Sequence, residues 1–348
     1  MTRAAFVIPG DITLPTGGYG YDRRVLAQLA AYGVDCTHVA LPGSYPSPTA
    51  ADLAETERTL AALPADTILL IDGLAFGAMP GDLVARITQK IVALVHHPLC
   101  LEAGLAPMRQ RLLKQTETMA LAFAEHVVVT SPMTGRIVAS DFGVAPGRLT
   151  VAEPGTERAA RARGSDSDRV QLLAVGSIVP RKGYDMLMHA LAPHNARDWS
   201  LLIVGAARDA GAVTAFEGAR DAHGLAPRVT LSGMVTDAEL DAFYAGTDIF
   251  VMPSHFEGYG MVLGEAMARG LPIVCTTGGA AADTAPDATA IKVSPGDAAA
   301  FGEGVARLIA DPALRRRMSD ASWAAGQNLP TWDDTARIIA AVLKRISP

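Results

Sequence analysis

Two glutamates, Glu257 and Glu265, are separated by seven residues in a segment that joins a glycine-rich loop to a predicted helix. Glu257 lies in the loop, where Gly258 and Gly260 let the backbone approach a ligand closely. Glu265 lies in the helix, which we expect to begin near Met261. A helix N-terminus offers free N–H groups and the positive end of the helix dipole, which bind phosphate. Carboxylates beside it accept hydrogen bonds from hydroxyls, so the segment fits a sugar nucleotide.

Two cations, Arg181 and Lys182, lie between a predicted strand and a predicted helix in the segment Gly176–Gly183. A loop that follows a strand and opens a helix is a common phosphate site. Positive charge there favours departure of a nucleoside diphosphate, because it stabilises the transition state more than the ground state. The alternative interpretation is a pair of solvated loop cations.

A histidine pair, His96 and His97, follows the apolar segment Ile91–Val95, which is typical of a buried strand. The carboxyl ends of parallel strands face ligands in open α/β sheets, so either imidazole is a candidate contact for a sugar. Near the N-terminus, Gly17 and Gly18 follow the turn after the first predicted strand. Taken alone, a histidine is more often structural, and a Gly-Gly pair is more often a plain turn.

Strands and helices alternate along the 348 residues, which predicts two α/β domains with parallel sheets covered by helices. The predicted strands are residues 4–8, 34–39, 67–71, 91–95, 127–129, 149–151, 170–175, 200–204, 229–231, 249–251, 273–275 and 290–293. The predicted helices are residues 19–32, 51–63, 82–89, 108–124, 133–140, 184–191, 213–223, 237–245, 262–269, 298–310, 312–325 and 331–346.

A polar segment without apolar periodicity, residues 158–168, predicts the linker between the domains. We therefore expect a Rossmann-like N-terminal domain over residues 1–157 and a similar C-terminal domain over residues 169–330. Ligands of such sheets bind beyond the carboxyl ends of the strands, which predicts a ligand cleft between the two domains.

The composition argues against several classes of protein. The net charge of −6 is unfavourable for a protein whose main partner is nucleic acid. No run approaches the roughly 18 to 20 apolar residues that span a bilayer, and the N-terminus fits a first strand better than a signal peptide. The three cysteines Cys36, Cys100 and Cys275 fit neither a disulfide framework nor a zinc site, which favours a reducing cytoplasm.

Five segments in family order resemble landmarks of the family 4 retaining glycosyltransferases, which have the GT-B fold. Glu257 and Glu265 resemble the E-x7-E motif of that family. The other four resemble its N-terminal glycine loop, its strand-end histidine, its Pro-Gly connection and its phosphate loop: Thr16–Gly18, Val95–Pro98, Glu153–Thr156 and Gly176–Gly183. The E-x7-E spacing alone is weak evidence, since glutamate is common, whereas five landmarks in order are specific.

The resemblance implies two Rossmann-like domains that face each other across a cleft, with a C-terminal helix in residues 331–348 that packs back on the first domain. It also implies transfer of a sugar, of the hexosyltransferase type, from a UDP- or GDP-sugar to a hydroxyl with retained configuration. The family is generally thought to use same-face attack, with the departing diphosphate accepting the proton of the acceptor. We therefore expect no protein nucleophile, no cofactor and no metal.

The resemblance also assigns roles to single residues. It places Glu265 at the ribose hydroxyls of the donor, and Glu257 at the hydroxyls of the transferred sugar, near the charge that develops at the anomeric carbon. Lys182 and Arg181 are expected at the diphosphate, and His96 rather than His97 at the donor sugar. The remaining expected donor contacts are Gly17, Gly18, Met234, Gly260, Met261 and Val262. His255 is expected to contact the motif residues and not the donor itself.

The chain departs from the family pattern at Ser177, where many members carry an arginine directly after the strand glycine. Either Arg181 takes over that charge or the site lacks it.

The acceptor remains open among a glycan, a lipid and a small molecule, and the resemblance favours a product of the cell envelope. The predicted helix over residues 108–124 bears on this question. Its basic residues Arg109, Arg111 and Lys114 face away from a row of mostly apolar residues: Leu105, Met108, Leu112, Thr116, Met119 and Phe123. The helix either makes peripheral contact with the inner face of a membrane or turns this row to the core.

Two rival functions are a sugar-nucleotide epimerase and a non-catalytic subunit that binds nucleotide sugars. The first requires acid–base carboxylates in the cleft and turns over donor without acceptor. The second is favoured by loss of the motif glutamates or the lysine, and all three are present. A dinucleotide oxidoreductase is disfavoured, because no G-x-G-x-x-G follows a strand in the first half.

Overall fold

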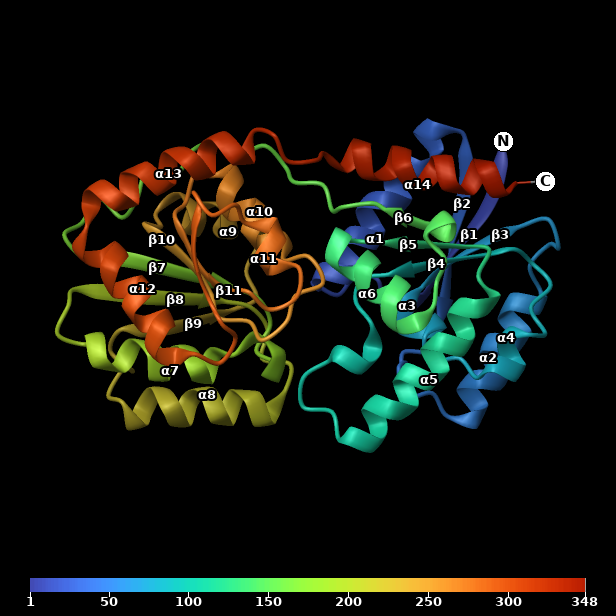
Figure 1. Cartoon of the computed structure of the whole chain (residues 1–348), viewed down its shortest axis with the longest axis horizontal. Helices are drawn as coiled ribbons and strands as arrows, with labels where there is room; N and C mark the ends of the chain where they lie inside the picture. Colours follow the sequence, from blue (N-terminus) through green and yellow to red (C-terminus); the bar gives the residue numbers. More distant parts are fainter. Residues whose placement is uncertain (348) are drawn as a thin grey trace. The chain divides into compact units, whose positions relative to one another are not determined.

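The structure is a computed structural model that describes residues 1–347. The chain forms two compact units, which are Met1–Gly155 together with the C-terminal segment from Pro330, and Thr156–Leu329. Each unit contains a six-stranded parallel sheet with helices on both faces (Figure 1). The predicted α/β class is confirmed.

The first unit has the strand order β2-β1-β3-β4-β5-β6. Its central strands β3 and β4 are buried along their whole length, as expected for parallel strands covered on both faces. The strands are β1 Thr2–Pro9, β2 Val34–Leu41, β3 Ile68–Asp72, β4 Ile91–Val95, β5 His126–Val129 and β6 Leu149–Val151. The helices are α1 Gly17–Gln28, α2 Ala50–Ala61, α3 Gly73–Phe76, α4 Gly81–Val84, α5 Pro107–Phe123, α6 Pro132–Phe142 and α14 Trp332–Ile346.

The second unit has the strand order β12-β11-β10-β7-β8-β9. Its strands are β7 Val170–Val175, β8 Trp199–Val204, β9 Val229–Gly233, β10 Ile249–Met252, β11 Ile273–Thr276 and β12 Ala290–Val293. Its helices are α7 Tyr184–Leu191, α8 Ala210–Ala222, α9 Asp237–Ala245, α10 Met261–Ala268, α11 Ala281–Thr284, α12 Ala298–Ala310 and α13 Pro312–Gly326.

In each sheet, the order in which the chain adds strands reverses at one point, the topological switch point. Ligands of open α/β sheets bind at such points. In the first unit the change falls between β1 and β3, so the segments after these strands lie side by side at the carboxyl edge. In the second unit it falls between β7 and β10, which pair in parallel. The loops after β7 and β10 carry Lys182 and Glu257.

All twelve predicted strands are present, and most helices begin and end within three residues of their predicted bounds. The predicted helix over residues 82–89 is wrong, because α4 ends at Val84. The chain then continues in turns, with Arg86 N–H donating to Leu83 O and Ile87 N–H donating to Val84 O, before it enters β4. The short helices α3 and α11 were not predicted.

The interpretation of α5 as a helix that turns the row from Leu105 to Phe123 to the core is wrong for most of the row, although Leu105, just before the helix, does pack against the core. Its core side is formed by Leu113, Glu117, Ala120 and Leu121, which are all buried. The apolar side chains that are exposed on α5 are Met108, Leu112, Met119 and Phe123. An unpartnered apolar row therefore remains at the surface of the first unit.

The C-terminal helix α14 packs against α1 in the first unit. Thr331 and Asp334 form a capping box at its start, and the Trp332 ring meets the Tyr21 ring edge to face at 5.7 Å. Near its end, Arg345 lies 3.2 Å from both ring nitrogens of His126. Helix α14 thereby completes the first unit.

Residues 158–168, which we expected to be a linker, lie in the second unit. Arg158 donates to Gly326 O at 2.6 Å, and Ala162 N–H donates to Arg269 O at 2.9 Å. Within residues 1–347, no helix has both the length and the apolarity that crossing a bilayer requires.

Candidate functional site

The two loop cations of the second unit converge on Glu257. Lys182 Nζ lies 2.6 Å from Glu257 Oε1, and an Arg181 guanidinium nitrogen lies 3.1 Å from Oε2. The same Arg181 nitrogen donates to Phe256 O at 2.7 Å. Each of the three side chains is at most 17% exposed, so the cluster is largely shielded from water. The structure thus brings together three of the predicted site residues from two loops.

The charge state of Glu257 follows from this arrangement. Burial alone would raise its pKa, but the charges of Lys182 and Arg181 outweigh burial and lower the pKa to about 2. Glu257 is therefore a carboxylate at any physiological pH. It can accept hydrogen bonds and interact with positive charge, and it cannot donate a proton.

Tight backbone packing holds the two loops against each other. Gly183 has φ +63°, and a Cβ at this residue would lie 2.5 Å from Pro253 O, so a larger residue would push the loops apart. His255 N–H donates to Arg181 O at 2.8 Å. On the other side, Glu257 N–H donates to Gly278 O at 3.1 Å. The position of the Glu257 carboxylate is therefore fixed by the backbone as well as by the ion pairs, with His255 acting through its main chain.

The helix that follows the motif loop begins at Met261, directly after Gly260 in the left-handed region at φ +88°. No side chain caps this N-terminus, and Met261 and Val262 in its first turn are half-buried. Backbone N–H groups there are consequently open to a ligand, as the sequence suggested.

Glu265 lies one turn further along α10 and is partly buried. Its Oε2 accepts a hydrogen bond of 2.8 Å from the Tyr244 hydroxyl. Burial first, and then the Glu265 charge, raise the Tyr244 pKa well above its ordinary value, so the phenol remains a donor. The Arg269 guanidinium lies over the Tyr244 ring, 4.4 Å from its centroid. One oxygen of Glu265 is thus held in place, and Oε1 has no partner among the described residues.

The other predicted donor residue of this unit, Met234, follows β9 and is 66% exposed. Gly233 before it has φ +74°, which turns the chain away from the sheet edge. Ser177 follows the strand glycine Gly176, whose carbonyl accepts a hydrogen bond from the Tyr184 hydroxyl at 3.0 Å. Met234 is thus free of the core and available to a ligand.

In the first unit, His96 lies at the end of β4 and forms a cluster with two buried aspartates. Its Nε2 lies 3.1 Å from Asp22 Oδ1 and 3.6 Å from Asp72 Oδ2. Asp22 is on α1, and Asp72 is the last residue of β3. Sequence patterns pointed to His96 and to neither aspartate. A charged residue at the end of the apolar run Ile68–Asp72 was the available signal for one of them.

The remaining predicted residues of this unit lie around His96. Thr16 caps α1, which begins with Gly17 and Gly18, by accepting from Tyr19 N–H. A Cβ at Gly18 would lie 3.6 Å from His96 Cδ2, so the glycine loop runs beside the imidazole. His97 instead pairs with Glu102 at 3.2 Å.

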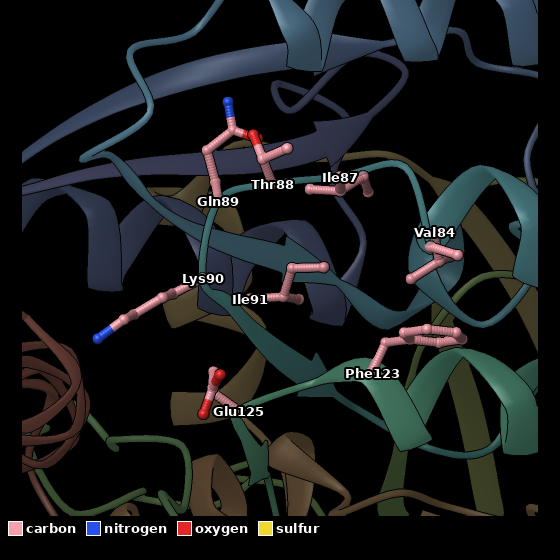
Figure 2. Close-up of a pocket in the computed structure, with 9 residues that line it drawn as sticks. Val84, Ile87, Thr88, Gln89, Lys90, Ile91, Phe123 and Glu125 are labelled. Atoms are coloured by element: carbon pink, nitrogen blue, oxygen red, sulfur yellow. The ribbon is translucent and has the colours of Figure 1, made fainter.

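A polar hollow at the opposite end of the first sheet carries none of these residues. It lies at the start of β4 and β5, has a volume of about 200 Å³, and includes Lys90, Phe123 and Glu125 in its wall (Figure 2). The amino ends of parallel strands are not the usual location of ligands in this architecture.

Residues 156–323, nearly all of the second unit, match the family model described as Glycosyl transferases group 1. All the predicted donor residues of the second unit lie within the matched segment.

Curated relatives cover both units. The chain is 28% identical over 278 residues to an MMP alpha-(1->4)-mannosyltransferase of Mycolicibacterium hassiacum, covering 75% of this chain and 67% of that protein. It is 29% identical over 302 residues to a GDP-mannose-dependent monoacylated alpha-(1-6)-phosphatidylinositol monomannoside mannosyltransferase of Corynebacterium glutamicum, covering 79% and 76%.

Among solved structures, a sucrose-phosphate synthase from Thermosynechococcus elongatus superposes with a TM-score of 0.83. The match covers 99% of both chains at 21% identity, so it supports the fold alone.

Proposed function

Since this chain is a group 1 glycosyltransferase with the GT-B fold, we propose that it moves a sugar, with retained configuration, from a nucleotide-diphosphate sugar to a hydroxyl acceptor. The observation that carries the proposal is the cluster of Arg181, Lys182 and Glu257 at the switch point of the second sheet. Two cations and one carboxylate there suit a group that combines a diphosphate with sugar hydroxyls.

The diphosphate binds beside Lys182. An ammonium group has three N–H donors, and Glu257 takes one of them at 2.6 Å. The remaining donors, together with the uncapped start of α10 at Gly260, Met261 and Val262, supply hydrogen bonds to phosphate oxygens. Arg181 adds charge to the same loop, where Ser177 contributes none.

The two glutamates bind the two sugars of the donor. Oε1 of Glu265 accepts from a ribose hydroxyl, while Tyr244 keeps the carboxylate in place. Glu257, ionised at all working pH values, accepts from hydroxyls of the transferred sugar and stabilises positive charge at the anomeric carbon. The exposed Met234 offers its backbone to the nucleobase.

Bond breaking needs no protein nucleophile in this proposal. The bond between the anomeric carbon and the leaving phosphate oxygen breaks while the acceptor oxygen attacks from the same face. The departing diphosphate takes the proton of the acceptor hydroxyl. The protein positions both substrates and stabilises charge through Lys182, Arg181 and Glu257, and through His96 at the donor sugar.

The donor is a GDP- or UDP-sugar, and the product belongs to cell-envelope polysaccharide or glycolipid. The Corynebacterium relative, a GDP-mannose-dependent mannosyltransferase of a phosphatidylinositol mannoside, supports both this donor class and a glycolipid product. We place the reaction in the cytoplasm, at the inner face of the membrane if the acceptor is a lipid.

The proposal is tested by incubating the protein with a panel of nucleotide sugars and candidate acceptors in excess EDTA. We expect transfer of one sugar with release of nucleoside diphosphate, because Arg and Lys supply the charge at the phosphates. Proton NMR of the product should show the anomeric configuration of the donor. Inverted configuration, or activity that EDTA abolishes and a divalent cation restores, would contradict the proposal.

A lipid acceptor makes a further prediction for α5. The exposed Met108, Leu112, Met119 and Phe123 would enter the interface of an anionic bilayer, while the basic residues of the helix attract its headgroups. Each cation near such a surface contributes about 1 kcal/mol. The protein should therefore co-sediment with phosphatidylglycerol vesicles at low salt, and replacement of Arg109, Arg111 and Lys114 by alanine should abolish that binding.

The matched control replaces three exposed arginines of the second unit, Arg197, Arg316 and Arg317, by alanine. This variant has the same net charge as the first and should still bind the vesicles. Equal loss of binding in both variants would indicate a general charge effect, and no binding by the wild type would favour a water-soluble acceptor.

A further inference from the structure

The cluster of His96, Asp22 and Asp72 is more elaborate than contact with a sugar requires. Three segments that are distant in the sequence, from α1, β3 and β4, bring two carboxylates to one ring nitrogen. Asp22 and Asp72 are almost completely buried, whereas the His96 side chain retains 21% exposure. The imidazole is therefore the one member of the cluster that a substrate can reach readily.

Hydrogen-bond chemistry determines the state of the ring. Nε2 lies 3.1 Å from Asp22 Oδ1 and 3.6 Å from Asp72 Oδ2, and toward an ionised carboxylate this nitrogen can only donate a hydrogen. Asp72 is itself fixed, because its Oδ1 accepts from Leu74 N–H at 2.6 Å. The second ring nitrogen, Nδ1, has no partner among residues 1–347. Carboxylates beside one nitrogen favour protonation of both, which makes Nδ1–H a donor for a ligand.

We propose that Asp22 and Asp72 are positioning residues that hold His96 as a protonated imidazolium, so that it meets the donor sugar as a fixed cationic hydrogen-bond donor and not as a base. The role at the donor sugar rests on the proposed function, whereas the charge state is a property of the protein alone.

The charges around the ring agree with this assignment. Burial alone would lower the His96 pKa, but the two aspartates outweigh burial and raise it to about 10. Burial and the charge of Asp72 raise the Asp22 pKa to about 8, so the pair shares one negative charge near neutral pH. This also relieves Asp22 Oδ2, which is buried without a hydrogen-bond partner and would be costly as an ionised oxygen.

The other groups packed against the ring contribute no competing charge. Tyr21 meets it edge to face at 5.1 Å, and burial raises the Tyr21 pKa well above its ordinary value, so the phenol is neutral. Thr130 donates its hydroxyl to the His96 carbonyl oxygen at 3.0 Å. Gly18 approaches the ring with backbone only, which leaves room beside it for a ligand.

The test is an NMR titration of histidine-labelled protein without substrate. The chain has eight histidines, and the His96 signals are those that the His96→Gln variant lacks. In the wild type, His96 should remain protonated from about pH 6 to about pH 8.5. In the Asp22→Asn/Asp72→Asn double variant no carboxylate remains, and burial should lower the His96 pKa below its ordinary value.

Each single Asn variant retains one carboxylate, so its His96 pKa should fall between those of the wild type and the double variant. Glu117→Gln is the matched control. Glu117 is a buried carboxyl of the same unit that accepts from Leu99 N–H at 3.0 Å, an interaction that glutamine can keep. This variant should leave the His96 titration unchanged.

The second measurement is the pH dependence of enzyme activity. If the two aspartates only stabilised the fold, the double variant would lose activity equally at all pH values. The double variant should lose about ten- to a hundredfold in kcat/KM at pH 8, where His96 has lost its charge. The loss should shrink as the pH falls below about 6, where the ring of the double variant begins to regain its proton.

Three results would overturn the proposal: a wild-type His96 that titrates near its ordinary pKa, a double variant whose His96 stays protonated at pH 8, or wild-type His96 signals that shift with Zn²⁺ and return with EDTA. If the double variant does not fold, the wild-type and single-variant titrations still decide the question. Absence of turnover with every nucleotide sugar would contradict the proposed function and leave the titration result standing.

Discussion

Replacing Lys182 by alanine is expected to lower kcat by about two to three orders of magnitude and to weaken donor binding as well. Its ammonium is the cation closest to Glu257, and its free donors face the departing diphosphate in the proposed complex. Charge on that group increases as the glycosidic bond breaks, so the loss should appear more strongly in kcat than in donor affinity. Steady-state kinetics with saturating acceptor measures both.

The Arg181→Ala variant, measured under the same conditions, tests whether Arg181 supplies the charge of the arginine that many family members carry at the position of Ser177. A loss similar to that of Lys182→Ala would show that Arg181 supplies the charge that Ser177 does not. An inert Arg181→Ala would show that the site works without that charge or draws it from elsewhere. Arg316→Ala, at an exposed arginine of α13, is the control and should behave like the wild type. A Lys182→Ala enzyme with normal kcat would contradict the phosphate role.

Glu265→Gln is expected to weaken binding of the donor by about 1 to 3 kcal/mol, because a ribose hydroxyl exchanges a charged acceptor for a neutral one. The substitution keeps the size of the side chain and an acceptor for Tyr244, so the fold of α10 should not change. Isothermal titration calorimetry with the nucleoside diphosphate measures the loss directly.

The Tyr244→Phe variant distinguishes the contact of Glu265 with the ribose from the hydrogen bond that positions Glu265. It removes the 2.8 Å hydrogen bond that holds Glu265 and leaves the carboxylate present, so its effect on affinity should be smaller than that of Glu265→Gln. Glu303→Gln, at an exposed glutamate of α12, is the matched control. Unchanged affinity in Glu265→Gln would refute the ribose assignment.

The sequence predicted the fold well where burial imposes a simple pattern. Strands that are covered on both faces, such as β3 and β4, appear as short apolar runs between turn residues, and these runs can be located by eye. The segments of Glu257 and Lys182 were found for a related reason, since glycine-rich loops between a strand and a helix are local features. Local patterns therefore gave the elements and the loops.

Interactions between distant segments could not be predicted in this way. Lys182 and Glu257 are 75 positions apart, and His96 and Asp22 are 74 apart, so no spacing rule connects them. Only the strand order places the loops after β7 and β10 side by side. The same order places Asp72 next to His96, through the pairing of β3 with β4.

In helix α5, the apolar residues have the correct helical period, but the face predicted to be buried is the wrong one. Its large apolar residues repeat at helical spacing, but the side that packs on the core combines two leucines with the small Ala120 and the buried Glu117. Hydrophobicity favoured the row of Met108 and Phe123 for burial. Packing against the short 3-10 turn Leu99–Leu101, where Glu117 accepts from Leu99 N–H, determined the outcome.

In the proposed function, the second unit holds a nucleotide-diphosphate sugar through Lys182 and Glu265. Calorimetric titration of the wild type and of the Lys182→Ala, Glu265→Gln and Arg316→Ala variants with UDP and GDP tests it most directly. At least one of the two diphosphates should bind the wild type, both site variants should bind it at least about fivefold more weakly, and Arg316→Ala should bind it normally. A wild type that binds neither diphosphate, or site variants that bind as tightly as the wild type, would contradict the proposed function.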